Sequence, residues 1–196
     1  DYVADLEALA DAFAPGEALN LVGHSLGGNV AMHYAGVRPE RVRAVVSLEG
    51  FGIPVEGPER APDKLAAWLD ALASPPGFAP YPSLQAVARR LQKNSPGLSG
   101  ERALWLARHW ADELPDGTAR LNSDPRHKLP FPTVYRFEEA SAIWRRIAAP
   151  VLWAVGLESH FLTWLGPARE GDATDGCDVV RRRLAEVPRA RLATIP

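Results

Sequence analysis

The segment Gly23-His24-Ser25-Leu26-Gly27 is the feature that most constrains how this chain can fold. A short apolar run precedes it, as in a buried strand, and a helical pattern follows it. Glycine on both sides of the serine is suited to a turn that is too tight for side chains at its shoulders. The pattern therefore predicts that Ser25 lies at a sharp corner between a strand over 18–23 and a helix over 26–37, in a strained backbone conformation.

The residues after this corner extend the pattern to a β-α-β unit. Pro39 and its neighbours end the helix, and 43–48 is a second apolar run with β-branched residues. A glycine-rich turn with a chance serine is the alternative, and the flanking strand and helix argue against it. Above a helix N-terminus, the Ser25 hydroxyl is placed where developing negative charge is favoured. The backbone N–H of Leu26 is the expected donor of an oxyanion hole.

The composition limits the classes of function. A chain of 196 residues with 46% hydrophobic and 23% charged residues fits one globular domain with an inserted subdomain. The net charge of −2 gives no footprint for nucleic acid or an anionic membrane. The single cysteine, Cys177, excludes an internal disulfide and offers no metal cluster. We expect a cytoplasmic protein with a small-molecule substrate and no metal, nucleic-acid or membrane partner; its oligomeric state is left open.

Alternating apolar runs and helical stretches predict a parallel sheet. Residues 1–52 are expected to form a core with the serine turn. Residues 53–148 predict a helical cap at the carboxyl edge of the sheet. They begin with a connector rich in Gly and Pro, and from about residue 62 they consist of helical segments divided by Pro and Gly, with no convincing strand. Residues 149–196 are expected to return to the core through strands over 151–155 and 191–195.

The chain resembles the α/β-hydrolase superfamily, in its serine-nucleophile branch with a helical cap. The resemblance rests on 23–28, on Pro39-Glu40-Arg41-Val42 before a strand, and on 149–156, and it follows the order of elements along the whole chain. It implies an α/β fold with a parallel sheet. The family's first strands, its second oxyanion donor and its catalytic histidine have no counterpart here. The resemblance therefore implies an internal fragment that is inactive by itself.

Two carboxylates compete for the role of the catalytic acid. The family's usual position follows the strand over 151–155, where this chain has Ser159, with Glu158 one residue earlier. Glu49 directly follows the strand over 43–48, a position that carries the acid in some members. The carboxyl end of a buried parallel strand is where open α/β sheets place functional groups. We favour Glu49 over Glu158; the alternative is that Glu49 only caps a turn.

Three further predictions concern a histidine, a phenylalanine and a run of arginines. Of the five histidines, His160 is the one expected near the catalytic edge of the sheet. In the family the catalytic base comes later in the chain, after the acid, and we expect this base to be absent here. Phe51, two residues after Glu49, is predicted to line the substrate pocket. The run Arg181-Arg182-Arg183 is interpreted as a solvated helix face.

A serine nucleophile points to acyl transfer, in which the hydroxyl attacks a carbonyl carbon and an oxyanion hole stabilises the intermediate. We expect a serine hydrolase that acts on a small, largely apolar carboxylic ester without a cofactor. A C–C bond hydrolase or a lactonase with the same turn, and a non-catalytic binding protein of this fold, remain the alternatives.

Overall fold

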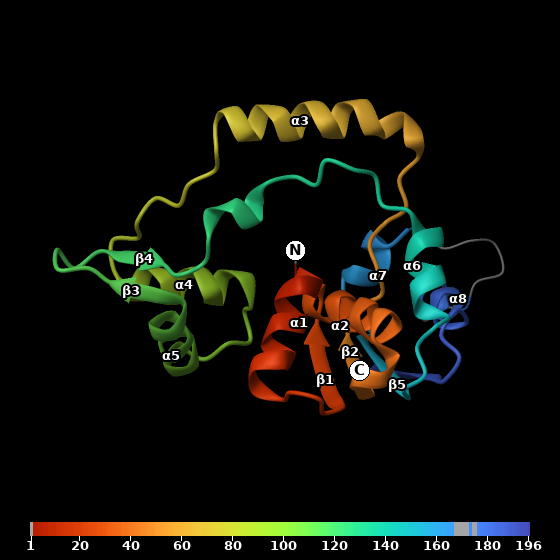
Figure 1. Cartoon of the computed structure of the whole chain (residues 1–196). Helices are drawn as coiled ribbons and strands as arrows, with labels where there is room; N and C mark the ends of the chain where they lie inside the picture. The colour runs from red at the N-terminus through yellow and green to blue at the C-terminus, as the bar shows by residue number, and fades with distance from the viewer. Residues whose placement is uncertain (1, 167–172, 174–175) are drawn as a thin grey trace. The chain divides into compact units, whose positions relative to one another are not determined.

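The computed structural model describes residues 2–166, 173 and 176–196 (Figure 1). The chain divides into two compact units. The first unit consists of Asp1–Gly57 and Tyr135–Pro196, and the second unit of Pro58–Val134. The serine turn and both candidate acids belong to the first unit.

The first unit alternates helices and strands. Its elements are α1 (Tyr2–Phe13), β1 (Leu19–His24), α2 (Leu26–Val37), the 3-10 turn η1 (Pro39–Arg41), β2 (Val42–Leu48), α6 (Phe137–Trp144), β5 (Val151–Gly156), α7 (Phe161–Trp164), α8 (Asp178–Leu184) and β6 (Ala190–Ile195). The four strands form one sheet in the order β1-β2-β5-β6, and every pair is parallel. The four strands and the parallel sheet that the sequence predicted are confirmed.

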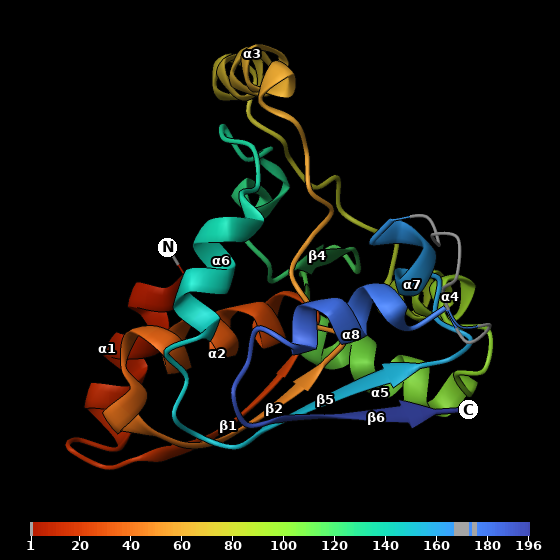
Figure 2. The ribbon, with the colours of Figure 1, turned by 90° about the vertical axis from the view of Figure 1, so that its right-hand side faces the viewer.

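The strand order places the helices on one face of this sheet. Successive strands are added in one direction, and crossovers between parallel strands are right-handed, so α2, α6 and α8 lie on the same side (Figure 2). On the other face, Val22, Val46 and Leu152 are neighbours in register. Val22 and Leu152 are exposed on that face.

Aromatic side chains fill the core between the sheet and these helices. Trp153 of β5 is fully buried, and its ring lies 5.4 Å from that of Trp144 and 4.9 Å from that of Phe51. Its indole N–H donates to the sulfur of Met32 on α2. The core therefore joins the helix that follows Ser25 to the strand beside β2.

The second unit has its own core and is mainly helical. It contains η2 (Pro58–Arg60), α3 (Ala61–Ala73), α4 (Leu84–Asn94), α5 (Gly100–Trp110), β3 (Ala111–Glu113), β4 (Ala119–Leu121) and η3 (Pro125–Lys128). The strands β3 and β4 pair antiparallel. The expectation of no strand in this region was therefore wrong, because a turn at Asp116-Gly117, where Gly117 has a φ of 82°, joins two short strands.

The boundaries of the second unit, Pro58–Val134, differ from those of the cap predicted over 53–148. Residues 135–148 belong to the first unit, in which α6 contacts α2. The position of a cap at the carboxyl edge of the sheet stays a prediction. Among the helices of the described residues, none is long and apolar enough to span a bilayer.

Glu186, which follows α8, connects this part of the chain to α6. Its Oε2 accepts hydrogen bonds from Ser141 Oγ at 2.8 Å and from Arg145 Nε at 2.7 Å. These bonds, the one from Ser141 most of all, hold the pKa of Glu186 below its usual value of 4.5.

We expect Glu186→Gln to lower the free energy of unfolding at pH 7 by about 1 kcal/mol, since a charge-assisted network at a partly open site is lost. A depressed pKa in the folded state gives stability above the ordinary value of 4.5 and loses it as the pH falls through the folded value. Urea unfolding of the variant and the parent should therefore converge in acid. The exposed Glu139→Gln on α6 is the control, and an undiminished difference in acid would contradict this account.

Candidate active site

Ser25 lies at the corner between β1 and α2, as the sequence predicted. Its backbone has a φ of 52° and a ψ of −117°, a region that residues other than glycine rarely adopt. The N–H of Ser25 donates to the carbonyl of Leu48 at 2.7 Å, which holds the corner against the end of β2. Ser25 is exposed, and its hydroxyl does not cap α2. The hydroxyl is therefore presented to solvent at the carboxyl edge of the sheet.

Close packing explains two glycines around this serine. A Cβ on Gly23 would lie 2.2 Å from the carbonyl oxygen of Gly27, and a Cβ on Gly28 would lie 2.5 Å from Ser47 Oγ. A Cβ on Gly27 would meet nothing within 4 Å. The second glycine that the corner requires is thus Gly28, and the expectation of a crowded Gly27 was wrong.

Leu26 is the first residue of α2, and its side chain is 46% exposed. The first bond of the helix runs from the N–H of Asn29 to the carbonyl of Ser25 at 3.2 Å. The N–H groups before Asn29 have no acceptor within the helix, as at every helix N-terminus. The Leu26 N–H is therefore suited to an oxyanion, and this role stays a prediction.

Glu49 lies at the equivalent place on the next strand. It follows β2 with a φ of 56°, and its N–H donates to the carbonyl of Ala154 at 3.0 Å. The side chain is half-buried, and Oε1 accepts from the N–H of Gly156 at the end of β5, at 3.2 Å. Among the described residues, Oε2 has no hydrogen bond. One carboxylate oxygen is thus anchored, and the other is left for a further donor.

Glu158 lies in an environment with fewer contacts. It is exposed in the turn after β5. The neighbouring Ser159, at the family's usual position for the acid, accepts a hydrogen bond at Oγ from the N–H of Phe161 at 3.2 Å, and so supports the start of α7. The geometry favours Glu49 over Glu158, and the catalytic role of either stays a prediction.

Phe51 and Arg183 differ most from what the sequence suggested. The Phe51 ring is fully buried and packs against Trp153 and Phe161 in the core. The predicted contact between Phe51 and the substrate stays a prediction. Arg183 was expected on a solvated helix face, but it is 5% exposed. The sequence contains a signal for this burial, because Arg183 is three positions after Val180 and therefore lies on the buried side of α8.

No histidine of the described residues is hydrogen-bonded to Ser25 or Glu49. His24 is exposed at the end of β1, the His33 ring lies 2.8 Å from the carbonyl of Asn29, and His160 is exposed before α7. The described side chains also contain no group of three or more His, Cys, Asp or Glu that could hold a metal ion.

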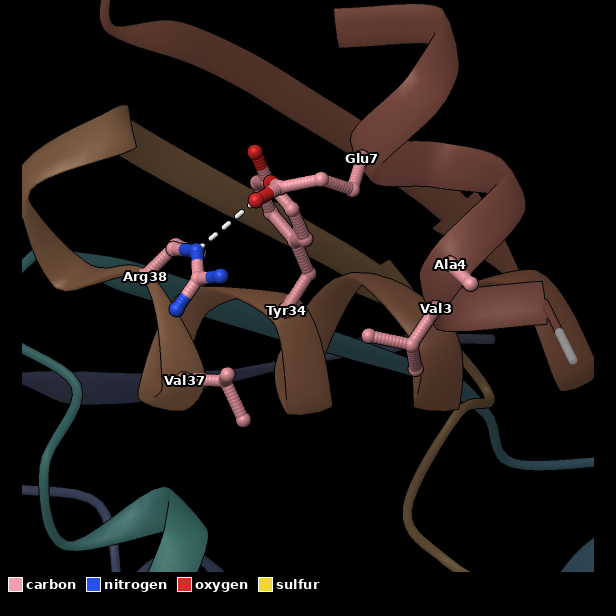
Figure 3. A pocket seen from close by; sticks show the side chains of 6 residues that line it. All are labelled: Val3, Ala4, Glu7, Tyr34, Val37 and Arg38. Atoms are coloured by element: carbon pink, nitrogen blue, oxygen red, sulfur yellow. Dashed lines mark hydrogen bonds and ion pairs between the residues drawn. The ribbon is translucent and has the colours of Figure 1, made fainter.

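A pocket of about 320 Å³ lies between α1 and α2 (Figure 3). Glu7 and Arg38 form an ion pair at 2.8 Å beside it, and burial raises the pKa of Tyr34 to about 12. The residues that line it include neither Ser25 nor Glu49. It is therefore separate from the candidate site.

The glycine contacts give a matched pair of variants. We expect Gly23→Ala to lower the free energy of unfolding by about 4 kcal/mol or more, because the new methyl group meets backbone atoms that cannot move alone. Gly27→Ala should be neutral or stabilising by up to about 1 kcal/mol, since its Cβ meets open space at a helix start. Urea unfolding measures both. Equal losses at the two positions would contradict the packing described here.

Comparisons with known proteins agree with this architecture. The chain is 39% identical over 56 residues to a serine hydrolase-like protein of Danio rerio, a stretch that covers 28% of this chain and 17% of that protein. A hypothetical protein of Pseudomonas aeruginosa PAO1 superposes with a TM-score of 0.78 at 24% identity, over 100% of this chain and 65% of its own. The thioesterase domain of the curacin biosynthetic pathway gives 0.75 at 21% identity, over 98% and 63%.

This chain therefore spans less than two thirds of the length of each of these proteins. Because the structural identities are below 25%, these two structures show a common fold and no common substrate. The family model described as alpha/beta hydrolase fold matches residues 1–170, which is most of the chain. The chain belongs to the alpha/beta hydrolase family.

Proposed function

We propose that this protein is a serine hydrolase that cleaves small, largely apolar carboxylic esters by acyl transfer. Ser25 is the nucleophile, Glu49 is the acid that orients the base, and the N–H of Leu26 is one donor to the oxyanion. The proposal concerns the natural full-length protein, because the chain spans only part of its relatives.

One observation carries the proposal. Among the described residues, Ser25 and Glu49 are the two residues other than glycine with a positive φ. They follow β1 and β2, which are adjacent parallel strands, so both lie at the same edge of the sheet. Strained backbone of this kind costs about 1–3 kcal/mol per residue and clusters at functional sites. The strain and the shared edge support a catalytic pair.

The chemistry follows from these positions. The base is the histidine that the resemblance to the family implies, and no described histidine hydrogen-bonded to Ser25 or Glu49 supplies it. This base takes the proton of the Ser25 hydroxyl as Oγ attacks the ester carbonyl, and Glu49 stabilises the imidazolium that forms. The N–H of Leu26 donates to the oxyanion of the tetrahedral intermediate. Collapse of this intermediate expels the alcohol, which receives the proton from the base. Water then hydrolyses the acyl-enzyme by the same steps, giving the carboxylic acid and free Ser25.

The proposed substrate class rests on the serine nucleophile and on the similar solved structures. A serine nucleophile suits a carbonyl, and one of the similar structures is named a thioesterase, which cleaves a related acyl bond. Thioesters are therefore the second class to be assayed. A cytoplasmic location and the absence of a cofactor are part of the same proposal.

Ser25→Ala should lower the turnover of short-chain p-nitrophenyl esters by the full-length protein about 10³-fold or more, because no other group replaces the nucleophile. Steady-state kinetics, with thermal unfolding to confirm the fold, measures this. Turnover that is independent of Ser25 would refute the proposal. A folded protein that binds esters without turning them over would favour the non-catalytic alternative.

The two carboxylates form a second matched pair. Glu49→Gln should lower kcat about 10²- to 10⁴-fold, because an amide favours the wrong tautomer of the base. Glu158→Gln should change kcat by less than about threefold, since Glu158 is exposed in the turn after β5. The opposite ranking would assign the acid to Glu158. If neither variant loses activity, the proposed catalytic pair is wrong.

A further inference from the structure

Arg183 is a buried cation in the core of the first unit. It lies on α8, is 5% exposed, and burial lowers the pKa of its guanidinium. Its guanidinium carbon lies 5.2 Å from the centre of the Phe137 ring. Desolvation of a charge is unfavourable unless hydrogen bonds or opposite charges compensate it.

Backbone carbonyls compensate this charge. Nη1 donates to the carbonyl of Phe51 at 2.5 Å, and Nη2 donates to the carbonyl of Ile53 at 2.8 Å. Among the described residues, no carboxylate forms an ion pair with Arg183. Both carbonyls belong to the segment that directly follows Glu49, so the two charge-assisted bonds act on the loop that carries the candidate acid.

The same loop is held from its other side. Ser47 Oγ donates to the carbonyl of Gly50 at 3.0 Å, and the N–H of Gly52 donates to Asn29 Oδ1 at 2.7 Å. Asn29 lies on α2, one turn after Ser25. The loop from Gly50 to Ile53 is thus fixed between α2, which follows the nucleophile, and α8.

Glycine at position 52 makes room for the guanidinium. Gly52 has a φ of 83°, and a Cβ there would lie 2.7 Å from Nη1 of Arg183 and 2.5 Å from the hydroxyl of Tyr135. Loop and arginine therefore fit each other closely. This arrangement opposes relaxation of the strained backbone at Glu49, three residues earlier.

We propose that Arg183 is a positioning residue for the catalytic acid. By holding the carbonyls of Phe51 and Ile53, it keeps Glu49 at the end of β2 with Oε1 on the N–H of Gly156 and Oε2 directed to the base. It touches neither substrate nor reacting atoms. This inference rests on the proposed function, and its test separates the two.

The test compares Arg183→Lys and Arg183→Gln in the full-length protein, alone and combined with Glu49→Gln. The single ammonium of lysine does not reproduce the planar fork of donors with which Arg183 binds the two carbonyls. We therefore expect kcat on p-nitrophenyl esters to fall about 10- to 100-fold, with KM within about twofold. In the Glu49→Gln background the same change should alter kcat by less than about twofold, because the group that Arg183 positions has already lost its role.

Arg189 provides the matched control. It is exposed after α8, and its Nη1 donates to the carbonyl of Ala148 at 3.0 Å, before β5 begins. Arg189→Lys and Arg189→Gln remove the same type of bond away from Glu49. They should leave kcat unchanged within about twofold in both backgrounds.

Three outcomes would overturn the inference. The first is an equal loss of kcat in the parent and in the Glu49→Gln background. The second is a rise in KM at constant kcat. The third is unfolding of both Arg183 variants while the Arg189 variants stay folded. The last outcome assigns Arg183 to the fold alone. Failure of the proposed function is recognised separately, because it appears as activity retained in Ser25→Ala, or in both Glu49→Gln and Glu158→Gln.

Discussion

The close packing of the turn after β1 against the end of β2 is the contact on which the rest of the site depends. Gly23 allows close contact with the carbonyl of Gly27, and Gly28 allows close contact with Ser47 Oγ. The N–H of Ser25 donates to the carbonyl of Leu48. A side chain at either glycine would force its neighbours to shift, and at Gly23 these neighbours are backbone atoms of the turn that carries Ser25. The position of Ser25, the proposed nucleophile, is therefore set by backbone atoms at the ends of two adjacent strands.

The same sheet edge brings the second strained residue into place. Parallel pairing in register puts the ends of β1, β2 and β5 side by side, which allows Glu49 to follow β2 and accept a hydrogen bond from Gly156. Helix α8 then acts on the loop after Glu49 through Arg183. Segments far apart in the sequence thus fix the two candidate catalytic groups.

The parts predicted from the sequence have strong local signals. Four apolar runs predicted the four parallel strands, and the glycines around Ser25 predicted the corner before α2. The hydrogen bonds of Arg183 and the burial of Phe51 could not be predicted in the same way, because they arise from the loop after β2 folding back onto α8. The strands β3 and β4 are three residues each and too short for a periodic pattern, although Asp116-Gly117 is a turn signal.

The central claim is that Ser25 is an activated nucleophile. A fluorophosphonate reacts readily with a serine whose hydroxyl is activated by a base and presented beside an oxyanion hole, and far more slowly with an ordinary serine. Mass spectrometry of the full-length protein after this treatment tests the claim directly. The account predicts a single covalent adduct on the peptide that contains Ser25, formed much more slowly in Glu49→Gln. An unmodified protein, or an adduct at another residue, would contradict it.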